Sequence, residues 1–280
     1  MIYEEIMNAP HTLIAGTTGS GKSTLMNGII RELVENDKPM ILIDPKMVEL
    51  SIYEDCDNCI GYAEELDDIM STLGAVIDLI KMRYQTMKDN RIRFTDEREI
   101  YVIIDELADL MISERKKDVQ KALQKILQIG RAAGIHIIAA TQSPSRKVIP
   151  AELVLNFTDR IALRCLSAIE SRQVINKAGA EKLPKYGTAI YMNGDGYREV
   201  EIPYVSTEDA EAIAEMHSYG EITEDVYAER NGNVGLLVAA FMIIPSITFF
   251  IHPILGIASF VGIFIKLLKS DLSKPMPSAV

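Results

Sequence analysis

Residues 16–23 read Gly-Thr-Thr-Gly-Ser-Gly-Lys-Ser and fit the phosphate-binding pattern G-x-x-x-x-G-K-[ST] without a mismatch. An apolar run at 13–15 precedes them and a helical stretch at 24–30 follows, which is the strand–loop–helix setting that the pattern requires. Glycines permit tight turns that bring several backbone N–H groups around one anion at a helix N-terminus. Lys22 is long enough to reach the outer phosphates of a nucleotide, and the Ser23 hydroxyl is a Mg²⁺ ligand. The predicted nucleotide-binding residues are Gly16, Thr17, Thr18, Gly19, Ser20, Gly21, Lys22, Ser23 and Thr24.

A second chemical feature is the acid pair that follows the apolar run at 101–104, namely Asp105 and Glu106. Two acids after a buried strand resemble a Walker B element, in which the first acid binds the metal ion and the second polarises the attacking water. Acids also follow strands because they cap the next helix. It is the phosphate loop upstream that favours interpreting this pair as a Walker B element. We therefore assign Mg²⁺ to Asp105 together with Ser23, and activation of water to Glu106.

The order of the apolar runs predicts the fold that positions these residues. Short unbroken runs, as expected for parallel strands covered on both faces, occur at 40–43, 101–104 and 135–140. Segments with helical spacing alternate with them, and shorter strands are predicted at 160–165, 188–192 and 199–204. This alternation predicts an α/β domain with a mainly parallel sheet. Ligands gather at the carboxyl ends of such strands, so Thr141 and Gln142, which end the third run, suit a γ-phosphate sensor.

Composition narrows the functional classes. The net charge of -11 argues against a protein that coats nucleic acid through an overall basic surface, although a ring could keep its basic groups in a central channel. The three cysteines are too few for a disulfide scaffold. The motif at 56–59 is a lone C-x-x-C without the second pair that a zinc site needs, so we expect two reduced thiols there. Residues 1–10 lack the apolar core of a signal peptide.

Several further short sequence motifs surround the phosphate loop and the acid pair. They are PHTLIAG at 10–16, IDPKMVEL at 43–50, IDELADLM at 104–111, GRAAGIH at 130–136, ATQSPS at 140–145 and GAEKL at 179–183. Together and in this order they resemble the motor domain of the FtsK/SpoIIIE family of DNA translocases, over about residues 8–205. The resemblance implies a RecA-like P-loop NTPase fold, ATP and Mg²⁺ as cofactors, and a homo-oligomer, a hexameric ring around double-stranded DNA.

The resemblance also implies roles for individual residues. Lys22, Glu106 and Gln142 would act in catalysis, and Arg131 of the Arg-Ala-Ala-Gly word would reach the ATP of a neighbouring subunit in trans. Such an arginine is worth ~10³-fold or more in rate because it stabilises charge at the γ-phosphate. Arg131 could instead cap the end of its own helix, and Arg160 and Arg172 are the other candidates for the arginine in trans.

The chain departs from the family pattern in three places. Ser143 follows the Thr-Gln pair where family members usually carry arginine, which puts one basic contact in doubt. The domain that precedes the motor in the family and the winged-helix module that reads polar DNA sequences are not seen here. We therefore expect translocation without sequence-directed orientation, to be tested as equal travel from both ends of an asymmetric genomic fragment.

The C-terminal part is strongly apolar. Residues 234–251 carry no charge and would reach about 27 Å as a helix, enough for a hydrocarbon core, and 253–265 form a second apolar segment before Lys266 and Lys269. A transmembrane hairpin with both ends in the cytosol would satisfy the positive-inside bias, and a buried packing segment is the alternative. We thus divide the chain into a motor domain at 1–205, a polar connector with a short helix at 206–233, a helical membrane anchor at 234–268 and a tail at 269–280.

These features predict a cytoplasmic, membrane-tethered ATPase that translocates double-stranded DNA in transfer, segregation or packaging. An alternative is a membrane-associated P-loop ATPase that powers protein secretion or virion assembly, and a nucleotide-binding scaffold without motor activity is a third reading. Stimulation of ATP hydrolysis by DNA separates the first two, and complete loss of function in Glu106→Gln separates both from the scaffold.

Overall fold

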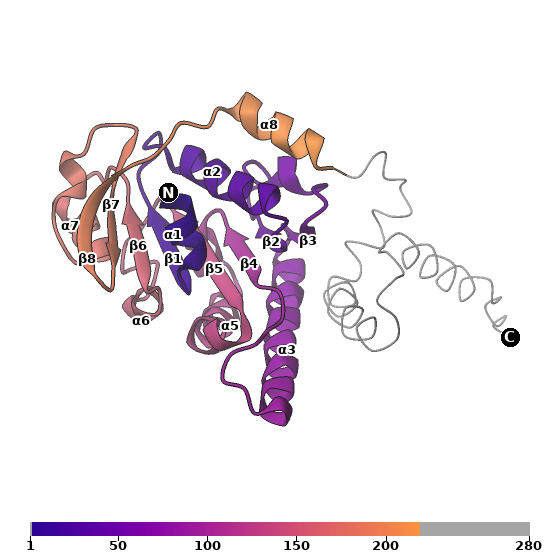
Figure 1. The fold of residues 1–280 in the computed structure, drawn as a ribbon. Helices are drawn as coiled ribbons and strands as arrows, with labels where there is room; N and C mark the ends of the chain where they lie inside the picture. The colour runs from indigo at the N-terminus through magenta and orange to yellow at the C-terminus, as the bar shows by residue number, and fades with distance from the viewer. Residues whose placement is uncertain (1, 219–280) are drawn as a thin grey trace, which may run out of the picture. The chain divides into compact units, whose positions relative to one another are not determined.

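The computed structural model describes residues 2–218, which are built around one eight-stranded sheet (Figure 1). The strands lie in the order β3-β2-β4-β5-β1-β6-β7-β8. Their bounds are β1 His11–Ala15, β2 Met40–Ile43, β3 Cys59–Ala63, β4 Ile100–Ile104, β5 Ile135–Thr141, β6 Asp159–Ala162, β7 Thr188–Asn193 and β8 Gly196–Glu201. Pairings from β3 through β6 are parallel, and β7 pairs antiparallel with both β6 and β8. The predicted mainly parallel α/β sheet is therefore confirmed.

The helices cover both faces of the sheet. Their bounds are α1 Ile2–Asn8, α2 Lys22–Glu35, α3 Leu66–Asn90, α4 Leu107–Ile112, α5 Lys116–Ile129, α6 Ala151–Leu155, α7 Ala168–Ile175 and α8 Thr207–Met216, with 3₁₀ turns η1 Ser51–Tyr53, η2 Arg131–Ala133 and η3 Ala180–Lys182. The connection from β1 to β2 runs across the sheet in one direction, and those from β3 to β4 and β4 to β5 run in the other. Right-handed crossovers therefore place α2 on one face and the packed pair α3 and α5 on the opposite face. This explains why β1, β2, β4 and β5 are buried along their whole length.

Helix α1 packs against α2, the helix that begins at the phosphate loop. Tyr3 of α1 is fully buried and lies against Gly28 of α2, where a Cβ would clash with the tyrosine ring. The Tyr3 hydroxyl donates a hydrogen bond to the Pro203 carbonyl at 3.2 Å, after the end of β8. Helix α8 also packs on α2, so segments from both ends of the described chain meet on this helix.

Several elements differ from the sequence prediction. Residues 2–8 form α1 and residues 59–63 form β3, and neither element was predicted. The helical segment expected before the strand at 135–140 ends at Ile129 and continues as the η2 turn. The short helix expected in the connector is α8, and Ser206 caps it reciprocally, because its hydroxyl accepts from the Asp209 N–H while the Asp209 carboxylate accepts from the Ser206 N–H.

None of the helices within residues 2–218 is both long and apolar enough to cross a membrane. The predicted membrane segment at 234–268, the connector beyond residue 218 and the tail at 269–280 lie outside the described residues.

Candidate nucleotide site

The phosphate loop joins the end of β1 to the start of α2 at the carboxyl edge of the sheet. Gly19 and Gly21 have positive φ angles of 72° and 93°, which glycine adopts without steric cost. A Cβ on Gly16 would clash with Ser20 Oγ and lie 2.7 Å from Leu163 Cβ, so only glycine fits where the loop passes β6. The residue types of the motif thus follow from the backbone path as well as from phosphate chemistry.

Lys22 and Asp105 face each other across the site. The Lys22 ammonium donates to Asp105 Oδ1 at 2.6 Å and to the Asp105 carbonyl at 3.1 Å, and both side chains are almost fully buried. Burying two opposite charges costs solvation that their pairing offsets, so each depends on the other for satisfaction. The predicted cation for phosphate and the predicted metal ligand are therefore brought together.

Glu106 is held at the end of β4 by donors from the end of β5. Thr141 Oγ1 donates to Glu106 Oε1 at 2.7 Å, and the Gln142 N–H donates to Oε2 at 2.9 Å. The Ala108 N–H, in the first turn of α4, donates to Oε1 at 3.2 Å. Glu106 is 2% exposed, and these donors hold its side chain in one position. The Gln142 side chain accepts from the Thr18 hydroxyl at 2.7 Å, which connects the predicted sensor to the phosphate loop.

Lys46 is a site residue to which the sequence analysis gave no role. Its ammonium lies 3.2 Å from Asp109 Oδ2 and 3.9 Å from Glu106 Oε2. Partial burial works against its charge, but Asp109 and Glu106 outweigh that effect and raise the pKa of Lys46. The loop that carries it is fixed by the buried Asp44 carboxylate, which accepts from the Val48 N–H at 3.0 Å and the Leu50 N–H at 2.9 Å. A lysine after β2 was visible in the sequence, but its proximity to Glu106 depends on β2 lying next to β4.

A cavity of about 580 Å³ opens over the phosphate loop. Its lining includes Thr17, Thr18, Gly19, Gly21, Lys22, Ser23, Thr24, Glu49, Gln142, Leu163, Tyr186, Gly187, Ile202 and Tyr204. The volume is in the range of small-molecule and cofactor sites, and the positive-φ glycines form an anion cradle on its floor. The buried Ser20 hydroxyl near this floor has no hydrogen-bond partner among the described residues. The residues present therefore fit a nucleoside triphosphate, and the oxygen donors Ser23 and Asp105 fit Mg²⁺.

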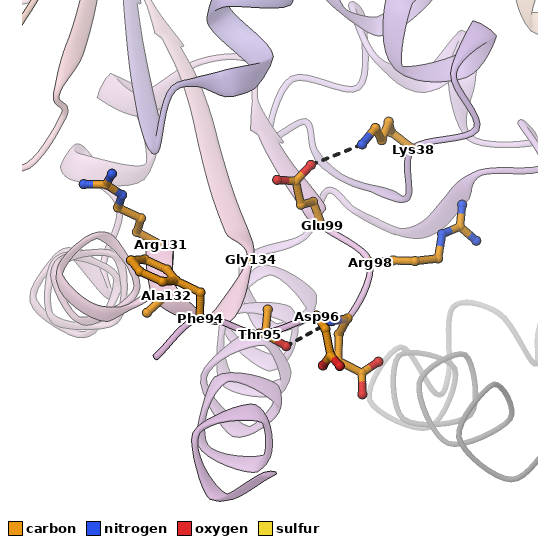
Figure 2. A pocket seen from close by; sticks show the side chains of 10 residues that line it. Lys38, Phe94, Thr95, Asp96, Arg98, Glu99, Arg131, Ala132 and Gly134 are labelled. Carbon is orange, nitrogen blue, oxygen red and sulfur yellow. Dashed lines mark hydrogen bonds and ion pairs between the residues drawn. The ribbon is translucent and has the colours of Figure 1, made fainter. Parts of the chain in front are cut away.

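Arg131 lies at the opposite edge of the sheet. It begins the η2 turn immediately before β5, whereas Thr141 ends that strand, so about 20 Å separates it from the phosphate loop of its own chain. It is exposed and lines a second pocket, of about 360 Å³, with Phe94 and Glu99. Figure 2 shows its guanidinium pointing away from the Lys38–Glu99 ion pair at the other side of this pocket. Arg131 cannot serve its own site, and its action in trans stays a prediction.

The two other arginine candidates differ from each other in the structure. Arg160 is 4% exposed, and its guanidinium donates to the carbonyls of Phe157 and Val174, so it is committed to the fold. Arg172 is exposed on α7. The three cysteines are buried, and the described residues contain no cluster of three or more metal-ligating side chains.

The sheet order, the phosphate loop, and the acids placed beside it define a P-loop nucleotide-binding domain of the RecA-like kind. The FtsK/SpoIIIE family matches residues 1–99 and 92–146, and the chain belongs to this family. DNA translocase FtsK of Rhizobium meliloti is 32% identical over 82% of this chain and 32% of its own length. DNA translocase FtsK of Staphylococcus aureus is 40% identical over 66% of this chain and 27% of its own. The chain thus spans about a third of the length of these curated relatives.

Solved structures support the same fold. The pCW3 conjugation coupling protein TcpA, in a monomer form with ATPγS, superposes with a TM-score of 0.66 at 24% identity, over 74% of this chain and 65% of that one. The cytoplasmic domain of the type VII secretion ATPase EccC of Thermomonospora curvata gives a TM-score of 0.61 at 20% identity, over 77% of this chain and 28% of that one. At these identities the likeness establishes the P-loop ATPase fold alone.

Proposed function

We propose that the chain is the motor of an ATP-driven translocase for double-stranded DNA. The observations that support this most are the identity of 32% and 40% with proteins named DNA translocase FtsK and the family match over residues 1–99 and 92–146, which contain the phosphate loop, Asp105, Glu106 and Gln142. The geometry supports ATP hydrolysis, because two residues that line the cavity contact the acid pair: Lys22 pairs with Asp105, and the Gln142 N–H donates to Glu106.

Each residue of the site has a chemical task in this proposal. Lys22 would leave Asp105 and bind the outer phosphates. Ser23 and Asp105 would hold Mg²⁺, which neutralises phosphate charge when bound. Glu106 would accept the proton of the attacking water from the position in which Thr141 and the Gln142 N–H hold it. Gln142 would report the state of the γ-phosphate to the loop through Thr18.

The test of the motor is the rate of ATP hydrolysis by the full-length chain with and without linear duplex DNA. We expect hydrolysis that DNA stimulates, and loss of that activity in Glu106→Gln. Hydrolysis that ignores duplex at every protein concentration would contradict the DNA part of the proposal. Absence of hydrolysis under all conditions would contradict the whole of it.

We further propose that the active form is a ring, with six subunits as the family resemblance implies. The exposed position of Arg131, far from its own phosphate loop, supports a role at the ATP of the next subunit. Hydrolysis per subunit would then rise steeply with protein concentration, whereas a rate per subunit that is constant on dilution to monomer would exclude the role in trans.

The cytoplasmic location and the membrane tether rest on the apolar residues 234–268. Full-length protein should stay with membranes on carbonate extraction and require detergent for release. Release by carbonate alone would refute the anchor.

The second candidate function is an ATPase for protein secretion or virion assembly at the membrane. The similarity in fold to the type VII secretion ATPase EccC supports this second candidate. Hydrolysis that is indifferent to duplex DNA and dependent on a protein substrate would select it.

A further inference from the structure

The nucleotide cavity extends beyond the phosphate loop along β6, β7 and the segment after β8. This extension is lined by Leu163, Tyr186, Gly187, Ile202 and Tyr204. Neither tyrosine was singled out in the sequence, because Tyr186 precedes β7 and Tyr204 follows β8, outside the recognisable motifs. Tyr186 is 59% exposed and Tyr204 is 80% exposed, so two aromatic rings are open to solvent at the cavity over the phosphate loop.

The position of Tyr204 is fixed despite its exposure. Its neighbours Ile202 and Val205 are buried at 6% and 2% exposure, and the Pro203 carbonyl accepts the Tyr3 hydroxyl. The backbone is thus anchored on both sides while the ring projects away from the core. An aromatic ring held in this way loses little conformational entropy when a flat ligand packs on it.

Tyr186 is placed directly beside the phosphate loop. The ammonium of Lys185 lies 4.9 Å from the centre of the Tyr186 ring. Lys185 Cε in turn lies 3.7 Å from the position that a Cβ on Gly19 would take. The Lys185 side chain therefore contacts both the Tyr186 ring and the phosphate loop, which places the ring close to the anion cradle. Gly187, with φ of 80°, turns the chain so that this pair faces the loop.

Few polar groups in this extension are available to hydrogen-bond to the edge of a base. The Ile202 N–H and the Gly187 carbonyl already bond to each other at 2.9 Å. The other polar side chains of the cavity belong to the phosphate loop, to Gln142 and to Glu49. Glu49 comes from the loop after β2.

We propose that Tyr186 and Tyr204 bind the base of the nucleotide by stacking, so that the site selects purine nucleotides by ring size and discriminates weakly between adenine and guanine. This inference rests on the proposed nucleotide binding and adds its base selectivity. Every base has an aromatic face, and stacking strength grows with ring size, so recognition by two rings favours purines without an edge contact.

The test compares the binding of ADP, GDP, CDP and inorganic tripolyphosphate to the full-length chain by calorimetry. We expect GDP to bind within roughly tenfold of ADP and CDP to bind at least about tenfold more weakly, the size of one stacking contact. Tyr204→Ala should weaken ADP by roughly tenfold and leave tripolyphosphate unchanged, whereas Tyr204→Phe should bind ADP as the wild type does. Tyr197→Ala is the matched control, because Tyr197 is 46% exposed on β8 and does not line the cavity.

The chain contains no tryptophan, so Tyr204→Trp gives a single reporter at the site. Its fluorescence should change on addition of ADP and not of tripolyphosphate. Unchanged ADP affinity in both Tyr204→Ala and Tyr186→Ala would overturn the proposal, as would an equal loss of ADP and tripolyphosphate. ADP binding more than ~100-fold tighter than GDP would show that an edge contact, and not stacking, selects the base. If the wild type bound no nucleotide at all, the proposed function itself would fail, which is a different result from intact ADP binding that the tyrosines do not affect.

Discussion

Replacement of Glu106 by glutamine changes one atom and tests the assignment of the catalytic base. In the structure both carboxylate oxygens only accept, Oε1 from Thr141 and Oε2 from the Gln142 N–H. An amide has one oxygen, so its NH₂ group must face one of these donors. We expect the unpaired donors to cost about 1–2 kcal/mol of folding free energy. For a domain of this size that is a fall in Tm of roughly 2–8 °C.

The effect on catalysis should be much larger than the effect on stability. A general base contributes about 10²–10⁴-fold to rate, which corresponds to roughly 3–5 kcal/mol in the activation barrier. We therefore expect Glu106→Gln to bind ADP normally, to melt only a few degrees below the wild type, and to hydrolyse ATP at least about 100-fold more slowly in a single-turnover assay.

Asp109→Asn is the matched control for this experiment. Asp109 lies on α4, the helix that Glu106 caps, and contacts the same lysine, Lys46, but it is 32% exposed whereas Glu106 is 2% exposed. Its ion pair is worth about 1 kcal/mol at most, so we expect hydrolysis within roughly fivefold of the wild type. If Glu106→Gln kept more than half of the wild-type single-turnover rate, or if Asp109→Asn lost as much as Glu106→Gln, the assignment of the base to Glu106 would be wrong.

Three further predictions follow from the site and its supports. Lys22→Ala should abolish detectable binding of both ADP and tripolyphosphate, because it removes the buried cation and leaves Asp105 unpaired; retained tripolyphosphate binding would contradict its role. Arg131→Ala and Glu106→Gln should each be inactive but recover hydrolysis when mixed, at about a quarter of interfaces, because one supplies the arginine and the other the base; no recovery in mixed oligomers would place Arg131 outside the reaction. Burial lowers the pKa of His11 from 6.5 to about 4, so the folded chain favours the neutral ring, and folding stability should fall as pH drops from about 7 toward 4, by on the order of 3 kcal/mol. Urea unfolding at pH 7.5 and 5 measures this, and His11→Asn, whose side-chain oxygen can replace Nδ1 as acceptor, should flatten the difference; an unchanged difference would show that other groups cause it.

The chemistry of the phosphate end could be predicted from sequence because its residues are close together in the chain or directly follow apolar strands. The loop at 16–23 contains its own turn residues, and Asp105 and Glu106 end a strand that must be buried. The rule that ligands gather at the carboxyl ends of parallel strands then brings Thr141 and Gln142 to Glu106, as the hydrogen bonds show.

The parts that could not be predicted depend on which strands are neighbours. Lys46 reaches Glu106 only because β2 pairs with β4, and spacing along the chain does not specify that pairing. Strand β3 contains Gly61 and no run of β-branched residues, so its pattern did not indicate a strand. Helix α1 has too few turns for its period to be recognised. Tyr186 and Tyr204 come from segments with no motif, and only the pairing of β7 and β8 places them at one cavity.

The contact between Tyr3 and Gly28 means that helix α1 supports α2, the helix that begins at the phosphate loop. The Tyr3 ring fills the space that the missing side chain of Gly28 leaves on α2. Its hydroxyl donates a hydrogen bond to the Pro203 carbonyl, next to Tyr204 of the cavity. Deletion of the residues before β1 would leave the surface beside Gly28 unpacked and the Pro203 carbonyl without the Tyr3 donor. Shortened versions of this protein should therefore lose nucleotide affinity even though every residue that lines the cavity is retained.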